Sequence, residues 1–211
     1  MISNENVELT NVKEIYEIIA KHFNSTRNYT WQWINDFLNS LPINSLVYDL
    51  GCGNGRNMIN KNINFIGIDN CNNFIEICKN KNLNVINSNI TNIPLPDNSA
   101  DAIICIATFH HLYTHENRLA SLNEMKRLIK PNCKILLSVW SINQPKKTRK
   151  IFTKYGNNIV TWNSYGRIYE RYYYIFKFKE IKKLFLDVGL NIISYKHDCG
   201  NEVFILTKLE L

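Results

Sequence analysis

The sequence predicts a single α/β domain built on one mostly parallel β-sheet, and three observations support this. Short apolar runs alternate with helical patterns from Pro42 to about residue 141, the order expected of β-α-β units. A glycine-rich turn directly follows the first of these runs. Residues 179–211 read as a helix and two strands, which would close the sheet with an antiparallel hairpin.

The predicted elements follow in order along the chain. Residues 12–23 and 31–41 have the apolar spacing of amphipathic helices, and Asn11 is placed to cap the first of them. Buried parallel strands are expected where the apolar runs are continuous, at 45–50, 64–69, 84–89, 101–108 and 134–140. Helices are expected between them, at 56–61, 72–81 and 117–130.

The C-terminal part has a different pattern. A helix at 179–188 ends at Gly189, and the runs 190–197 and 202–209 flank a short turn at 198–201, so they can pair as an antiparallel hairpin. We therefore expect one domain over 1–211. Its parts are N-terminal helices (1–41), a central core (42–141), a segment rich in basic and aromatic residues (142–178), and the closing helix and hairpin (179–211).

Composition excludes several classes of protein. The start MISNENVELTN has neither the basic nor the apolar region of a signal peptide, and no apolar run is long enough to span a membrane. The six cysteines are scattered without C-x-x-C pairs, which favours reduced thiols and argues against a metal site made by this chain. We expect a cytoplasmic protein that does not bind membranes, with the nucleus as the alternative location.

The net charge of +7 is unevenly distributed. Residues 142–183 hold 11 of the 25 Lys and Arg residues but only two acids, Glu170 and Glu180, so this segment carries +9. The rest of the chain has 14 basic and 16 acidic residues and carries −2. One basic segment on an otherwise neutral protein is the distribution expected of a nucleic-acid-binding surface.

The glycine-rich turn is the sequence Asp-Leu-Gly-Cys-Gly-Asn-Gly at 49–55. Alternate glycines let the backbone turn sharply and approach a ligand closely. A dinucleotide fingerprint would have a further glycine where Arg56 stands, so the spacing argues against a pyrophosphate ligand. Asp49 suits a cationic amino-acid ligand better than a phosphate. The pattern resembles the S-adenosylmethionine-binding motif of class I methyltransferases, which implies their Rossmann-like fold with a seven-stranded, mostly parallel sheet and an antiparallel C-terminal hairpin.

Further cofactor contacts are expected at the ends of the next strands. Asp69 ends the second strand, where a carboxylate can accept both ribose hydroxyls, although it could equally cap the following helix. At the third strand, Asn89 stands where the resembled family commonly has an acid for the adenine amino group, which leaves that contact open. The expected cofactor-binding set is Asp49, Gly51, Cys52, Gly53, Gly55, Asp69, Asn70, Asn89, Ile90 and Ile106.

Other segments carry a narrower resemblance. These are His22-Phe23-Asn24-Ser25-Thr26-Arg27, Ile106 to Leu112 with its His110-His111 doublet, Ser138-Val139-Trp140, Trp162-Asn163-Ser164 and Arg171-Tyr172-Tyr173. In this order they resemble the eukaryotic tRNA wobble-uridine carboxymethyl methyltransferases, which include the methyltransferase domain of the animal AlkB-type tRNA enzyme. The resemblance covers about residues 12–190, and the His22 to Arg27 string is its most specific part.

The resemblance implies methyl transfer from adenosylmethionine to the carboxylate of 5-carboxymethyluridine at the anticodon wobble position. A carboxylate is ionised at neutral pH, so the reaction needs positioning rather than a general base. Arg27 is the first candidate to hold the carboxylate, because a guanidinium offers a fixed fork; a surface salt bridge is its plainer alternative. His111 and His110 follow as candidate substrate contacts, or as structural support for the next helix. Trp140 could stack on the wobble base, or belong to the core.

The segment 142–183 also contains ten aromatic residues, and aromatic side chains among cations suit single-stranded RNA. Alternatively, the aromatics fill the core and the lysines form a solvated face. The expected RNA or substrate contacts are Trp140, Lys146, Lys147, Arg149, Lys150, Asn163 and Arg171. The resemblance implies two partners, the tRNA anticodon stem-loop and a small zinc-binding activator subunit of the tRNA methyltransferase 112 type, which would pair with the third-strand edge as a heterodimer.

Two other functions remain open at this stage. A small-molecule methyltransferase of the quinone or sterol type would share the glycine turn and the His doublet, but it would not need the basic segment. A cofactor-binding scaffold without activity is the second alternative, and the complete set of Asp49, the three glycines and Asp69 argues against it.

Overall fold

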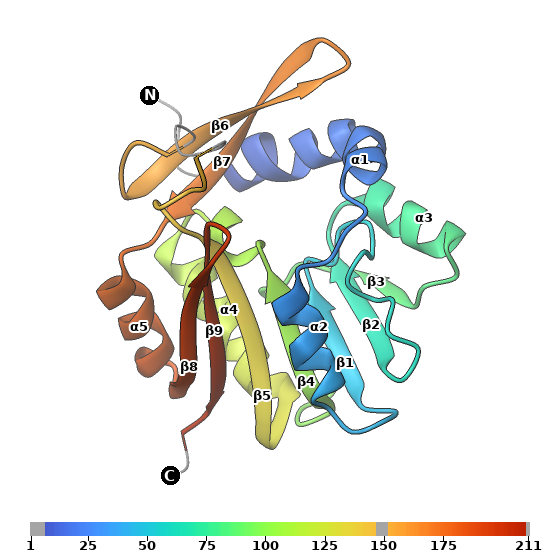
Figure 1. Cartoon of the computed structure of the whole chain (residues 1–211), viewed down its shortest axis with the longest axis vertical. Helices are drawn as coiled ribbons and strands as arrows, with labels where there is room; N and C mark the ends of the chain where they lie inside the picture. The colour runs from blue at the N-terminus through green and yellow to red at the C-terminus, as the bar shows by residue number, and fades with distance from the viewer. Residues whose placement is uncertain (1–6, 147–151, 210–211) are drawn as a thin grey trace.

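The computed structural model describes residues 7–146 and 152–209. Its main sheet has the strand order β3-β2-β1-β4-β5-β9-β8 (Figure 1). Parallel pairing joins the first five strands, and β9 runs antiparallel between β5 and β8. This confirms the predicted fold class. The strands are β1 (Leu46–Leu50), β2 (Asn64–Asp69), β3 (Val85–Asn87), β4 (Ala100–Ile106), β5 (Ile129–Trp140), β8 (Leu190–Asp198) and β9 (Asn201–Lys208).

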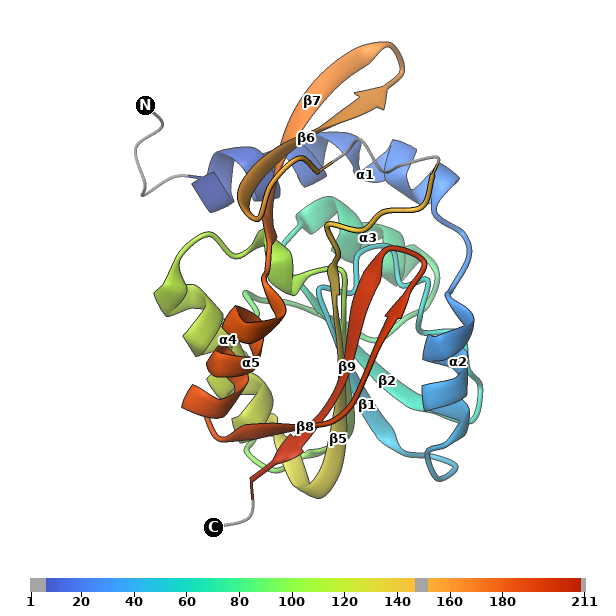
Figure 2. The ribbon, with the colours of Figure 1, turned by 60° about the vertical axis from the view of Figure 1, so that its left-hand side comes forward.

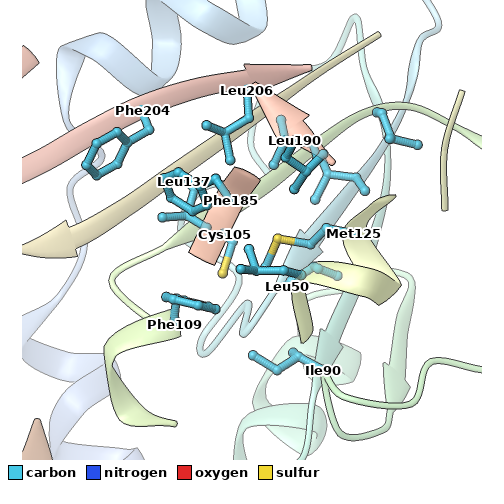
Figure 3. Close-up of a cluster of buried hydrophobic side chains, with 14 of the residues drawn as sticks. Leu50, Ile90, Cys105, Phe109, Met125, Leu137, Phe185, Leu190, Phe204 and Leu206 are labelled. Carbon is cyan, nitrogen blue, oxygen red and sulfur yellow. The ribbon is translucent and has the colours of Figure 1, made fainter. Parts of the chain in front are cut away.

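Helices cover both faces of this sheet because alternate strand residues point to opposite sides. On one face α4 (His115–Leu128) and α5 (Phe178–Asp187) bury a large apolar cluster that includes Leu50, Phe109 and Phe204 (Figure 3). On the other face α2 (Gln32–Asn39) packs on a smaller cluster. Neighbouring residues divide between the two clusters: Ile103 belongs to the first and Ile104 to the second.

Three elements lie over the carboxyl ends of the parallel strands. They are α1 (Glu14–Thr26), which continues a π-helical turn η1 (Leu9–Lys13), α3 (Asn72–Asn80), and a separate hairpin of β6 (Gly156–Ser164) and β7 (Arg167–Ile175) (Figures 1 and 2). Glu17 joins α1 to α3, because its carboxylate accepts hydrogen bonds from the backbone N–H groups of Asn72 and Asn73 at 2.6 and 2.9 Å. These elements therefore form a roof over the sheet edge.

The sequence did not predict the β6–β7 hairpin inside the basic and aromatic segment. Alternating burial along β6 and the exposed turn at Tyr165 and Gly166 are the signals that could have predicted it. The charge of the segment drew attention to RNA instead. Because the inner side chains of the hairpin pack toward α1, several of the predicted RNA-binding residues belong to the wall of a cavity.

Two local predictions were wrong. Residues 56–61 form turns rather than a helix, since the segment is rich in asparagine and follows Gly55, which has a positive φ of 74°. Asn11 does not cap a helix, because helical backbone already begins at residue 7 and Asn11 lies within η1. No helix in the described residues is long and apolar enough to cross a membrane.

Candidate functional site

A cavity of about 1260 Å³ lies between the carboxyl ends of the parallel strands and the roof formed by α1 and the β6–β7 hairpin. Parallel strands end at the same sheet edge, so the loops that follow β1, β2, β3 and β4 all contribute to it. The side of α1 and the inner face of the hairpin provide the remaining walls. The cavity is large enough for a nucleoside cofactor together with a second ligand group.

The glycine turn forms the floor beside β1. Gly51 has a φ of +72°, and a Cβ there would meet the Thr108 side chain at 2.2 Å, so only glycine fits. Gly53 also has a positive φ, of +55°, but a Cβ there would meet only the Phe23 ring, at 4.0 Å. The space above Gly53 therefore belongs to the cavity, and a side chain there would occupy it.

Asp69 lines the cavity at the end of β2 and ties two of its walls together. One carboxylate oxygen accepts from the Gly53 N–H at 2.8 Å and the other from the Cys71 N–H at 2.9 Å. Each oxygen keeps a further lone pair, so both predicted roles are compatible: the carboxylate fixes the start of α3 and can still accept ribose hydroxyls. Burial raises the pKa of Asp69 to about 6, although these two N–H bonds lower it.

Asp49 lies beneath the glycine turn, fully buried. Neither of its carboxylate oxygens has a hydrogen-bond partner among the described residues. Burial raises its pKa to about 7, while the nearby Arg56 charge lowers it. A buried carboxylate without hydrogen bonds is costly unless a positive charge compensates it. The donor set thus fits a ligand that carries a cationic amino group, which is the property of adenosylmethionine that dinucleotides lack.

The other predicted cofactor residues surround the same floor. Cys52, Asn70, Ile90 and Ile106 line the cavity. Asn89 also lines it, but its amide oxygen already accepts from the Thr91 N–H at 3.2 Å, so it is committed in part to its own turn. Gly55 is not at the cavity wall; it packs against Cys78 and Leu83, which fixes the end of the glycine turn.

At the opposite end of the cavity, His111 is held by both of its ring nitrogens. Its Nδ1 lies 2.8 Å from the Tyr172 carbonyl oxygen, and its Nε2 lies 3.0 Å from the Tyr16 hydroxyl. The carbonyl can only accept, so Nδ1 carries the proton and donates. Burial lowers the pKa of His111 to about 3, so the ring is neutral and Nε2 accepts from Tyr16. His111 therefore braces α1 against the hairpin.

His110 is bound on one side only. It is fully buried, and its Nδ1 accepts a hydrogen bond from the Trp140 backbone N–H at 3.1 Å. Burial and the neighbouring His111 lower the pKa of His110 well below its usual value. The neutral ring must then carry its proton on Nε2, and this N–H has no partner among the described residues. Of the two predicted histidines, His110 is the one with a hydrogen-bond donor available at the cavity wall.

Two arginines meet over one indole ring. The guanidinium carbons of Arg27 and Arg171 lie 4.8 and 4.7 Å from the centre of the Trp162 ring, and all three side chains line the cavity. His22, the first residue of the predicted motif, orients this ring by accepting from the Trp162 Nε1–H at 3.1 Å. The structure thus brings together the His22 to Arg27 string and Arg171, although about 140 residues separate them in the sequence.

The remaining predicted substrate residues have different positions. Trp140 lines the cavity and stacks on Tyr173, with ring centres 4.9 Å apart. Lys146 is at the cavity rim. Asn163 is exposed near the hairpin turn, where its side chain accepts from the Gly166 N–H, so it does not face the cavity. Lys147, Arg149 and Lys150 lie outside the described residues.

Sequence reasoning missed three aromatic side chains that shape this end of the cavity, Tyr16, Trp162 and Tyr173. Trp162 and Tyr173 belonged to recognised strings, but nothing in the sequence separated cavity walls from core. Tyr16 lies one helical turn from Ile19 and Ala20 and reads as the apolar face of a helix. The missing signal was the hairpin itself, which brings β7 against α1.

Comparison with known proteins places these observations in context. A family model described as a methyltransferase domain matches residues 48–137. The Schizosaccharomyces pombe tRNA (carboxymethyluridine(34)-5-O)-methyltransferase is 30% identical, over 90% of this chain and 92% of its own length. The mouse tRNA (carboxymethyluridine(34)-5-O)-methyltransferase ALKBH8 is 39% identical over 68% of this chain, but the match spans only 22% of the mouse protein.

Solved structures agree on the fold. An S-adenosylmethionine-dependent methyltransferase from Clostridium acetobutylicum superposes with a TM-score of 0.70 at 15% identity, covering 93% of this chain and all of the other. A chain of the complex between the Haloferax volcanii Trm112 methyltransferase activator and a methyltransferase has a TM-score of 0.68 at 14% identity, covering 95% and 98%.

Proposed function

The chain belongs to the tRNA (carboxymethyluridine(34)-5-O)-methyltransferase family, and we propose that it methylates the carboxylate of 5-carboxymethyluridine at position 34 of tRNA. The observation that carries the proposal is the pairing of two ligand environments in one cavity. Carboxylates lie at the glycine-turn end, and arginines with a neutral histidine N–H lie at the hairpin end. The first suits a cationic nucleoside cofactor and the second an anionic substrate.

The cofactor is S-adenosylmethionine, which supplies an electrophilic methyl group when bound. The residues of the glycine turn would hold it: Gly53 leaves space for it, Asp69 can accept hydrogen bonds from its ribose, and Asp49 compensates its positive charge from below. Phe23 of α1 lies above Gly53 and helps to exclude water from this end of the cavity.

The chain's own residues have a limited chemical task. The substrate carboxylate is already ionised at neutral pH, so no residue has to remove a proton. His110 and His111 are both neutral and buried, which suits hydrogen bonding rather than proton transfer. Arg27, Arg171 and His110 provide donors without any acceptor, and they hold the anion in place while one oxygen reacts. Positioning of this kind accounts for a large part of the rate in displacement reactions.

Recognition of the RNA would use the basic segment around the hairpin. Lys146 stands at the cavity rim, and Lys147, Arg149 and Lys150 follow it directly in the sequence. Tyr165 at the hairpin turn is 79% exposed and packs on His22 at 4.7 Å, so its ring is available for stacking on a base. Cations beside an exposed ring suit a single-stranded anticodon loop.

A small zinc-binding activator subunit is the proposed protein partner. The chain's fold matches that of a protein complex containing the Trm112 activator, at 14% identity. Strand β3 is three residues long, forms the end of the sheet order and pairs on one side only, with β2. A partner strand added at this edge would protect it. The heterodimer would act in the cytoplasm, where mature tRNA is decoded.

Methyl transfer to bulk tRNA with radiolabelled adenosylmethionine tests the proposed function. A carboxylate methyl ester hydrolyses in mild alkali, whereas methyl groups on bases and ribose remain. We expect label in tRNA that alkali releases as methanol. Transfer to a quinone or sterol extract without transfer to tRNA would favour the small-molecule alternative, and cofactor binding without any transfer would favour the scaffold.

A further inference from the structure

Arg171 is a buried cation without an anionic partner. Its side chain on β7 belongs to a residue only 4% exposed, surrounded by the rings of Trp162, Tyr173 and Tyr16 at 4.7, 5.2 and 5.9 Å. It donates to the Tyr16 hydroxyl at 3.2 Å, its Nε–H has no partner, and no carboxylate of the described residues forms a salt bridge with it. A buried, unpaired charge of this kind is costly, so it calls for an anion.

A second buried arginine shows the contrast. Arg118 is 5% exposed and also packs on aromatic rings, but its guanidinium donates to the carbonyl oxygens of Leu112 and Tyr113 at 3.1 and 2.9 Å. Arg118 is thus satisfied by the backbone and has a structural role. Arg171 is equally buried, lacks such acceptors among the described residues, and lines the cavity.

The hydrogen-bond directions around Arg171 are fixed. His111 donates to the Tyr172 carbonyl, so Tyr16 must donate its hydroxyl proton to His111 Nε2. The Tyr16 oxygen then accepts from the Arg171 guanidinium. This chain orients the guanidinium and leaves its remaining N–H groups for a ligand.

His110 presents the matching donor. Its Nε2–H is fully buried and without a partner because the Trp140 N–H occupies Nδ1. The two groups flank one ring: the centre of Tyr173 lies 4.9 Å from the His110 ring and 5.2 Å from the Arg171 guanidinium carbon. Together they offer only donors, in surroundings made of aromatic carbon, and a planar anion with two oxygens satisfies both.

We propose that Arg171 and His110 hold the substrate carboxylate, and that Arg27 contacts the nucleotide backbone outside it. This inference rests on the proposed function. It moves the role predicted for Arg27 from the reacting group to a phosphate, because Arg27 is half-buried and lies farther from the closed end, whereas Arg171 is enclosed by rings. Arg27 and Arg171 share Trp162, so two anionic groups of one nucleotide would neutralise two cations that otherwise repel each other.

The test compares two anticodon stem-loops that differ only at the wobble base, one with 5-carboxymethyluridine and one with the neutral amide 5-carbamoylmethyluridine. Binding is measured with S-adenosylhomocysteine present, so that no turnover occurs. The wild-type protein should prefer the acid by about tenfold or more, as expected of charge-assisted hydrogen bonds. R171Q should lose this preference, and R171K should keep part of it. H110N keeps an acceptor for the Trp140 N–H but withdraws the Nε2–H donor, so it should also reduce the preference.

Two controls make the result specific. R27Q should weaken both stem-loops by the same factor and leave the preference intact. K182Q removes one exposed charge on α5 and should change neither value. Unchanged affinity for S-adenosylhomocysteine, measured by calorimetry, establishes that each variant is folded.

The outcomes separate the inference from the proposed function. If the wild-type protein methylates the acid stem-loop and R171Q retains the full acid preference, Arg171 does not hold the carboxylate. Loss of the preference in R27Q instead would return that role to Arg27. A wild-type protein that neither methylates the acid nor prefers it would overturn the proposed function itself.

Discussion

Replacing Gly53 with alanine should remove cofactor binding at a small cost in stability. Alanine in the left-handed region costs about 1–2 kcal/mol, and the new Cβ meets no protein atom closer than 4.0 Å. It projects instead into the space assigned to the cofactor. Gly166 at the hairpin turn offers a matched control, because it also has a positive φ (+83°) and a Cβ there would meet nothing within 4 Å. Both variants should therefore unfold about 2–8 °C below the wild-type protein.

The two variants should differ in their response to adenosylmethionine. A ligand at a hundred times its dissociation constant adds about 2.7 kcal/mol of stability, which raises the unfolding temperature of a chain of this size by about 5–11 °C. We expect that increase in the wild-type protein and in Gly166→Ala, and almost none in Gly53→Ala. Thermal unfolding with and without cofactor, supported by calorimetry, measures it. Wild-type affinity in Gly53→Ala would place the cofactor elsewhere.

Three further predictions concern pH, RNA and the partner. Burial holds the Asp69 pKa near 6, above the ordinary 3.8, so the cofactor-free protein should lose stability as pH rises from about 4 to about 6, while cofactor affinity should rise as the carboxylate ionises; Asp69→Asn should remove the step near pH 6 in calorimetric titrations, and an unchanged pH profile would refute the role of this group. Neutralising Lys146, Lys147, Arg149 and Lys150 together should weaken stem-loop binding and reduce the slope of log affinity against log salt by about 0.7–0.9 per lost phosphate contact; an unchanged slope would exclude this run as the RNA-binding surface. Co-expression with the zinc-binding subunit should increase soluble yield and cofactor affinity, and a monodisperse, fully active chain without a partner would contradict the proposed heterodimer.

The sheet was predictable because buried parallel strands leave continuous apolar runs separated by glycine-containing turns. The glycine turn was predictable for a related reason: Gly51 has no alternative beside Thr108, so the steric requirement is visible as a residue type. The cofactor end of the cavity depends on residues that immediately follow strands. Its position in space therefore follows from the topology alone.

The substrate end could not be predicted in the same way. It depends on β7 returning across α1, so Arg171 meets Tyr16 and Trp162 through contacts between distant segments. Sequence patterns indicate that an arginine is present, but not whether its charge is exposed or buried. The two histidines were likewise indistinguishable in sequence, and only the Trp140 N–H and the Tyr16 hydroxyl assign them different hydrogen-bonding roles.

Single-turnover methylation of defined anticodon stem-loops tests the proposed activity most directly. The chain, with and without the activator subunit, is mixed with radiolabelled adenosylmethionine and a stem-loop carrying either 5-carboxymethyluridine or uridine at position 34. We expect one methyl group per carboxymethyl stem-loop, released by mild alkali, and none on the uridine stem-loop. Alkali-stable label, or equal labelling of both stem-loops, would contradict methylation of the wobble carboxylate.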